Sequence, residues 1–218
     1  MFGPLKDFKK EFLVSAIFLL ALGFLIRDLP FLKYAFLYGI DSLGHFWFSK
    51  MIVESGHLYP DHLEVSYIGD TGWFTGYAPY FGLHMLEAEV SLITGIELEK
   101  LYLNLVALLS VLTVVPIYLL SRLKLKNNLK AFSSVILSTF WFYFIFYSFI
   151  GTYETLGLFL FVLIVYFVEK EQVNAKLNYL VILIFLLVLI VTHHLSTLAL
   201  ISYLTVAYII KTVSYTHL

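Results

Sequence analysis

The chain has 218 residues, of which 61% are hydrophobic and only 13% are charged, and its formal net charge is −1. Soluble domains carry about 25% charged residues, so this composition argues against an ordinary soluble protein, and the apolar residues run in long blocks of the kind that a lipid bilayer surrounds. The absence of cysteine excludes disulfides and thiolate chemistry, and the near-neutral total charge indicates no nucleic-acid partner.

The first predicted membrane span begins at Phe12. Its apolar run reaches Ile26 and is extended by Leu29–Leu32, and three lysines lie between residues 6 and 10. The segment has no small-x-small cleavage motif and continues into a charged Arg27-Asp28 pair. We therefore expect an uncleaved anchor and not a signal peptide.

A long loop, residues 33–100, follows this span, and connections of such length are usually functional. Within it, Asp41–Ser55 is predicted to form a helix that Gly56 ends, and Tyr80–Thr94 a second helix that Gly95 ends. Charged residues in the middle of the second helix favour the membrane interface. Aromatic residues near and between these helices could line a sugar or prenyl groove or form an aromatic belt: Tyr67, Trp73, Phe74, Tyr77 and Tyr80.

Four further apolar blocks complete the predicted fold. A spanning helix needs about 20 mostly apolar residues, and the blocks are Leu101–Ser121, Ala131–Ile150, Thr155–Val168 and Leu177–Ile210. The last is too long for one span and suits two short ones, although no Gly or Pro marks a turn. We therefore expect an all-α, polytopic transmembrane bundle of about six spans, with two interfacial helices in the long outer loop.

Charge distribution predicts the orientation of these spans. With the N-terminus in the cytoplasm, most of the 14 Lys and Arg residues fall on the cytoplasmic side, including the short loop Arg122–Lys130. Most of the 15 acids fall on the other side, together with six of the seven histidines. We expect an integral plasma-membrane protein whose active face is extracytoplasmic.

Asp41 and His45 are the first candidates for chemistry. They lie four residues apart, so on a helix they share a face. A carboxylate beside an imidazole can hold a metal or activate a hydroxyl or amide nucleophile. The alternative is that Asp41 only caps the helix while His45 faces water.

Three later residues are further candidates. Glu154, at the outer start of a span, is favoured there by the helix dipole alone, yet it could join Asp41 in a divalent-cation site. His193 and His194 are consecutive, so on one helix they point about 100° apart and are poorly placed to ligate one metal together. One of the two could reach the site while the other packs or meets lipid headgroups.

Four motifs, in order along residues 1–212, together resemble GT-C type membrane glycosyltransferases, in particular archaeal members related to the oligosaccharyltransferase catalytic subunit. Gly39-Ile-Asp41-Ser-Leu-Gly-His45 is similar to their first outer loop, and Tyr77-Ala-Pro79-Tyr-Phe-Gly-Leu-His84 to their second outer helix. Thr152-Tyr-Glu154-Thr-Leu-Gly157 is similar to a Pro-Glu-Thr-Leu-Gly opening of a later span, with Tyr153 in place of Pro. Thr192-His-His-Leu-Ser196 resembles a histidine motif of the archaeal branch.

The resemblance implies transfer of a sugar from a polyprenyl-phosphate donor to a protein or lipid acceptor at the outer membrane face. Asp41 would be the catalytic base or a metal ligand, and Glu154 a second ligand for Mg or Mn. His45, His84, His193 or His194 would contact phosphate. The family is longer than this chain, so residues 1–212 would be the N-terminal part of its transmembrane domain, and residues 213–218 resemble a foreign tail.

Two other functions remain open at the level of sequence. A lipid-linked oligosaccharide flippase or polymerase could share the outer aromatic surface without needing Asp41. A non-catalytic membrane subunit would need neither. No His-Glu-x-x-His motif is present, which argues against a metalloprotease.

Overall fold

The computed structural model describes residues 17, 20–27, 40–57, 81–140, 152–170 and 175–216. Within these ranges all regular structure is α-helical, which confirms the predicted fold class at that level. Besides helical residues 20–27, the helices are α2 (Ile40–Ser55), α3 (Gly82–Thr94), α4 (Leu98–Leu112), α5 (Val114–Leu125), α6 (Asn128–Phe140), α8 (Tyr153–Glu169), α9 (Ala175–Thr192) and α10 (His194–Thr216).

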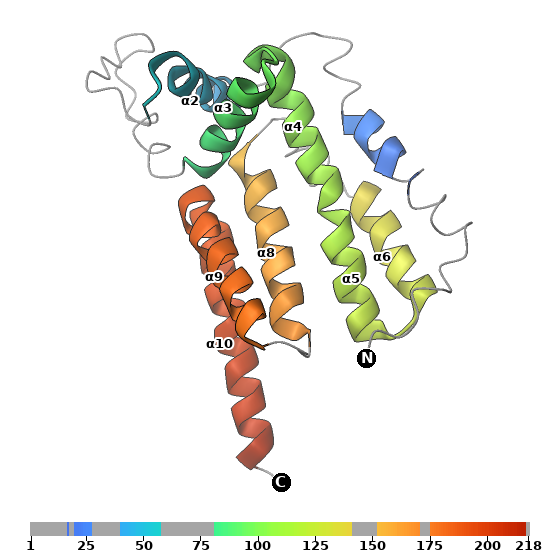
Figure 1. The fold of residues 1–218 in the computed structure, drawn as a ribbon. Helices are drawn as coiled ribbons and strands as arrows, with labels where there is room; N and C mark the ends of the chain where they lie inside the picture. The colour runs from blue at the N-terminus through green and yellow to red at the C-terminus, as the bar shows by residue number, and fades with distance from the viewer. Residues whose placement is uncertain are drawn as a thin grey trace.

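The helices run back and forth between two ends of the molecule (Figure 1). Helix α4 continues through α5 to the far end, α6 returns beside α5, and α8, α9 and α10 alternate in direction. Helices α2 and α3 pack together across the end at which α4 and α8 begin and at which α9 meets α10. This end therefore gathers segments that are far apart in the sequence.

Helices α4 and α5 form one long rod with a local irregularity. The helical hydrogen bonding is disturbed at Thr113, whose N–H contacts the carbonyls of both Leu109 and Ser110. Pro116 has no N–H to donate to the carbonyl four residues earlier, which explains an irregularity at this point. The rod spans Leu98–Leu125, 28 residues.

The expectation of about six spans is not supported. Among the described residues, Leu98–Leu125 is the one helix long and apolar enough, by length and composition, to cross a membrane. The predicted split of 177–210 occurs, but the apolar parts of the two helices, Leu177–Thr192 and His194–Ile210, each have at most 17 residues. Residues 141–150, which were to complete another span, lie outside the described ranges, as does most of the first predicted span.

The core lies where α8 packs against α3, α4, α9 and α10. Its members are apolar side chains that are almost completely buried: Leu83, Val106, Leu109, Tyr153, Leu156, Leu160, Ile164, Val165, Leu189 and Leu200. Helix α8 contributes about half of them. Helix α8 is therefore the central element, and its first residues belong to both the core and the site described below.

The outer faces of α9 and α10 are strongly apolar. Large side chains there are about half exposed, among them Leu180, Leu183, Leu187, Leu198 and Ile201. Soluble monomers rarely expose continuous apolar surfaces of this extent.

Arg27 is a buried charge at the contact between the first helical segment and the bundle. Its guanidinium is fully buried and donates to Ser110 Oγ at 2.8 Å, to the carbonyl of Gly23 at 2.9 Å and to that of Thr139 at 3.3 Å. These acceptors come from three helices, so the side chain joins residues 20–27 to α4 and α6.

A second polar contact joins three helices at the end of the bundle that lies opposite α2 and α3. Glu169, the last residue of α8, forms an ion pair with Lys124 of α5 and accepts a hydrogen bond from the hydroxyl of Tyr203 on α10. The Glu169 side chain is 13% exposed and that of Lys124 is 52% exposed, so water reaches the lysine side of this contact. Helix α10 continues beyond Lys211 to Thr216, so the change of composition at residue 213 does not end the helix.

Candidate functional site

The candidate site lies at the end of the bundle covered by α2 and α3 (Figure 1). Four segments contribute side chains to it: α2, α3, the first turn of α8 and the junction between α9 and α10. Three of the predicted substrate-binding histidines, His45, His84 and His193, lie here. The sequence assigned them to motifs separated by up to about 150 residues.

A buried polar network joins α2 to α3. His45 Nδ1 lies 3.3 Å from His84 Nε2, and His84 Nδ1 lies 3.3 Å from Ser49 Oγ. Ser49 Oγ also lies 2.5 Å from Glu87 Oε2 and 3.1 Å from the carbonyl of His45. Each of these four side chains is at most 1% exposed. Polar groups in such a setting are stable only when they are hydrogen-bonded to one another.

Helical spacing explains why these four residues meet. His45 and Ser49 are four apart on α2, and His84 and Glu87 are three apart on α3, so each pair shares one helix face. The two faces pack against each other. The sequence predicted that the helix carrying Glu87 and Glu89 lies at the membrane interface, which stays a prediction. In the structure Glu87 lies on the buried face of α3, whereas Glu89 is exposed.

Burial determines the protonation of the network. Removal from water lowers the pKa of His84 to about 4. It also lowers the pKa of His45 well below 6.5, and the nearby His84 and His193 add to that effect. Burial raises the pKa of Glu87 well above 4.5, although the hydrogen bond to Ser49 acts in the opposite direction. At neutral pH the two imidazoles are therefore neutral, and burial favours the protonated form of Glu87.

Tyr153 connects this network to the second half of the site. Its ring meets the ring of His45 edge-on, with ring centroids 4.5 Å apart. The ring of His193, at the α9–α10 junction, has its centroid 5.0 Å from that of Tyr153. Tyr153 is itself 8% exposed and belongs to the apolar core. The three rings form a continuous row from α2 to the α9–α10 junction.

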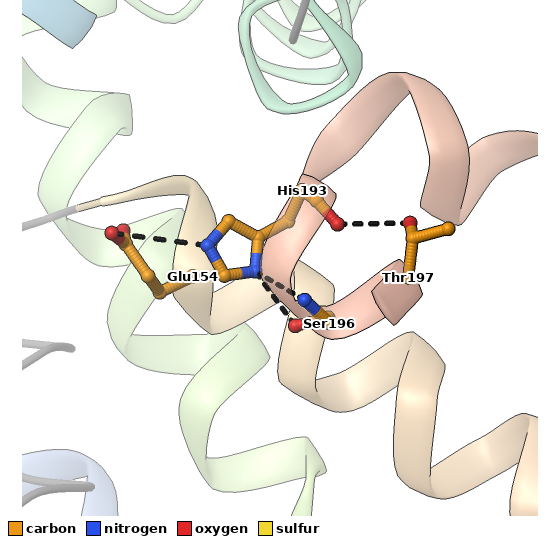
Figure 2. Close-up of polar contacts among 4 residues, drawn as sticks. All are labelled: Glu154, His193, Ser196 and Thr197. Atoms are coloured by element: carbon orange, nitrogen blue, oxygen red, sulfur yellow. Dashed lines mark hydrogen bonds and ion pairs between the residues drawn. The ribbon is translucent and has the colours of Figure 1, made fainter. Parts of the chain in front are cut away.

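His193 and Glu154 form the second half of the site (Figure 2). His193 precedes α10, and its Nδ1 accepts the backbone N–H of Ser196 at 3.2 Å and contacts Ser196 Oγ at 2.7 Å. This is the geometry of a helix N-cap. Because Nδ1 accepts a hydrogen bond from the Ser196 N–H, the neutral ring carries its own proton on Nε2. Nε2 faces Glu154 Oε1 at 4.0 Å, a distance too long for a direct hydrogen bond.

Two glycines allow the close packing of this region. A Cβ on Gly157 would lie 2.6 Å from His193 Cβ and 3.0 Å from its Nδ1. A Cβ on Gly82 would overlap Thr192 Oγ1. Helices α8 and α3 can therefore approach the α9–α10 junction only because these positions lack side chains.

The remaining predicted site residues are not part of the buried network or of the row of rings among the described side chains. Asp41 lies in the first turn of α2, but its side chain is outside the described part of the structure. His194 is exposed and His193 is buried, and their ring centroids lie 5.6 Å apart at the break between α9 and α10, so the two histidines do not share one helix as the prediction assumed. The aromatic residues between 67 and 80 also lie outside the described residues.

No metal-binding cluster is present among the described side chains. Within those ranges, no group of three His, Cys, Asp or Glu residues is arranged to hold an ion. Since the side chain of Asp41 is not among them, the predicted metal pair of Asp41 and Glu154 stays a prediction. The side chain of Glu154 is 30% exposed, although its Oε2 is buried.

Sequence reasoning overlooked Ser49 and did not name Glu87 as a site residue. A detectable signal existed, because His-x3-Ser on one predicted helix and His-x2-Glu on the next each place two polar groups on one face. What the sequence could not indicate was that these faces meet.

Comparisons of the chain with protein-family models, curated proteins and solved structures found no match.

Proposed function

We propose that this protein is a membrane glycosyltransferase that moves a sugar from a polyprenyl-phosphate-linked donor to a protein or lipid acceptor. The main support is the convergence of four separate motif residues, His45, His84, Glu154 and His193, at one end of the helical bundle. An acid and several imidazoles close together can bind a phosphate leaving group and move protons, which are the two tasks of such a transfer.

The surface supports a bilayer location for the enzyme. The exposed apolar faces of α9 and α10 suit lipid better than water. In the proposal, Leu98–Leu125 crosses the bilayer fully, and the shorter apolar helices, together with the first apolar segment and 131–150, bring the total to about six spans.

Charge supports an extracytoplasmic site. The basic residues Arg122, Lys124, Lys126 and Lys130 lie at or near the end of the bundle opposite α2 and α3 (Figure 1). Basic residues in short loops favour the cytoplasm. The proposed orientation therefore places α2, α3 and the site at the outer face.

The individual roles follow from exposure and chemistry. Asp41 is the proposed base or metal ligand, and Glu154, with its partly exposed side chain, is the proposed second acid. His193 is 5% exposed and holds Nε2–H beside Glu154, so its proposed role is to orient that acid. His45 and His84 are too buried to meet substrate directly in this arrangement, so they act through the side chains that lie between them and the substrate. A bound Mg or Mn ion would neutralise phosphate charge.

The test is transfer by membranes that contain the protein. Membranes carrying wild type, Asp41→Asn or the control Glu54→Gln, an exposed acid on the same helix, receive a labelled polyprenyl-phosphate sugar. We expect transfer by wild type and the control and its loss in Asp41→Asn, with equal membrane insertion. Equal transfer by all three, or none by wild type, would refute the assignment and favour a flippase or a non-catalytic subunit.

A further inference from the structure

The network between α2 and α3 has a property that a purely structural contact does not require. Its contacts run in series, from Glu87 Oε2 to Ser49 Oγ, from Ser49 Oγ to His84 Nδ1, and from His84 Nε2 to His45 Nδ1. Every member can both donate and accept a proton. The chain passes through both nitrogens of His84, so one imidazole links its two ends.

Counting hydrogens gives the chain a direction. Ser49 has one hydroxyl proton and three acceptors within reach: Glu87 Oε2, His84 Nδ1 and the carbonyl of His45. When Glu87 is protonated it donates to Ser49, and the Ser49 proton is free to serve His84 Nδ1. His84 then carries its proton on Nε2 and donates to His45 Nδ1. His45 in turn carries its proton on Nε2.

We propose that Glu87, Ser49, His84 and His45 form a proton relay that delivers a proton from Glu87 to the Nε2 edge of His45. The Glu87 O–H bond breaks and its proton passes to Ser49 Oγ, while the Ser49 proton passes to His84 Nδ1. The proton on His84 Nε2 passes to His45 Nδ1, and the proton on His45 Nε2 passes through a water molecule to a phosphate oxygen of the departing polyprenyl phosphate. Glu87 becomes a carboxylate, and both imidazoles stay neutral with their tautomers exchanged.

The relay ends beside the proposed reaction centre. The His45 ring packs on Tyr153, and Tyr153 packs on His193, which faces Glu154. The destination of the relayed proton rests on the proposed function. In that reaction an oxygen of the departing polyprenyl phosphate gains a proton. The acceptor nucleophile loses one proton in the same transfer, which can reload Glu87 along the reverse path.

The surroundings leave Glu87 as the proton store. Other titratable groups around the relay are Tyr153 and Glu154 of α8, His193 at the α9–α10 junction, Tyr102 of α4, and Lys50, which pairs with Glu99 and Glu54 at the surface. Burial and the Ser49 hydrogen bond are the causes that act on the pKa of Glu87. The second carboxyl oxygen, Oε1, is buried without a hydrogen-bond partner, which the neutral acid tolerates better than a carboxylate.

The relay is tested spectroscopically on the 218-residue chain in lipid nanodiscs without substrate. Infrared spectra at neutral pH should contain a carboxylic-acid C=O band that disappears in Glu87→Gln and persists in Glu89→Gln, an exposed neighbour on α3. In Ser49→Ala this band should shift, since Glu87 loses its partner, and the ¹⁵N resonances of His84 should change tautomer population. Circular dichroism checks that each variant keeps its helices.

Two results would overturn the relay. One is the absence of an acid band that depends on Glu87 at neutral pH. The other is a Ser49→Ala variant whose Glu87 band and His84 resonances both match wild type. Because both signals are read without substrate, they decide the relay whatever the transfer assay shows. In that assay Glu87→Gln should lower transfer about 100-fold while Glu89→Gln leaves it unchanged.

Discussion

Gly157→Ala should disrupt the site by packing alone. The added Cβ would lie 2.6 Å from His193 Cβ and 3.0 Å from its Cγ. Carbon atoms in contact lie about 3.5–4.0 Å apart, so α8 and the α9–α10 junction must separate by about 1 Å. His193 belongs to a helix cap and to the row of rings with Tyr153, so it cannot move without weakening both.

The expected cost follows from two opposing terms. Overpacking of a tight contact costs about 1–3 kcal/mol, whereas replacing a helical glycine by alanine contributes about 0.5–1 kcal/mol in favour of the helix. We therefore expect a net loss of about 1–2 kcal/mol in the free energy of unfolding. Equilibrium unfolding in mixed detergent micelles, followed by circular dichroism, measures it.

A double-mutant cycle separates this contact from a general effect on α8. His193→Gly removes the atoms that the new methyl group would meet, so Gly157→Ala in that background should stabilise by about 0.5–1 kcal/mol. The coupling energy should equal the overpacking term, about 1–3 kcal/mol. If Gly157→Ala destabilises both backgrounds equally, the contact with His193 is not its cause, and the reasoning fails.

Three other changes test the remaining contacts. Ser110→Ala should destabilise by about 1–3 kcal/mol because Nε of the buried Arg27 loses its acceptor, measured by unfolding. Tyr203→Phe should cost about 1 kcal/mol in the same assay by removing the hydroxyl that donates to Glu169. Stability should fall as the pH drops from 6.5 towards 4, because the pKa of His84 is about 4 when folded, and His84→Gln should reduce this loss.

The first two of these changes have matched controls. Ser133→Ala removes an exposed hydroxyl that bonds only to its own helix, and Tyr208→Phe alters a tyrosine that is 71% exposed. Both should change stability by less than about 0.5 kcal/mol. For the pH series the sign is decisive: the contribution of His84 is fully present above pH 6.5, so a His84→Gln variant that loses more stability on acidification than wild type would contradict its buried neutral state.

Local signals predicted much of the secondary structure. Helices expected at 41–55 and 80–94 appear as Ile40–Ser55 and Gly82–Thr94, and both end before a glycine with φ of +71°. Glycine adopts this left-handed conformation without the strain of a Cβ, so a glycine after an apolar-periodic segment is a reliable end signal. The same logic failed to locate the break in 177–210, because no Gly or Pro marks it.

The break at His193 has a cause that single-residue propensities do not contain. The His193 side chain accepts the N–H of Ser196 and so performs the capping task usually given to Ser, Thr, Asp or Asn. Since histidine is not a favoured cap, the sequence suggested a ligand or an interfacial residue and not the start of a helix. Its capping role and its position beside Glu154 use opposite nitrogens of one ring, so they are compatible.

The burial of Glu87 and Arg27 depends on tertiary packing. A glutamate in the middle of an amphipathic segment usually faces water, and only the docking of α3 on α2 turns this one inward. An arginine at the end of an apolar segment looks like a membrane-boundary residue, yet Arg27 finds its acceptors on α4 and α6, 83 and 112 residues further along the chain. Periodicity gives the faces of helices but not their partners.

Tyr153 stands where the motif that the chain resembles has a proline, and the structure gives this difference a physical role. A proline there would open α8 with its fixed φ but would place no ring between His45 and His193. The tyrosine ring contacts both, at 4.5 Å and 5.0 Å, and so joins the α2–α3 network to the acid and imidazole of the second half. Gly157, one turn later on α8, leaves room for His193 to reach that ring. Tyr153 and Gly157 thus both determine the position of His193. Tyr153 contacts its ring, and Gly157 leaves the space that the ring needs.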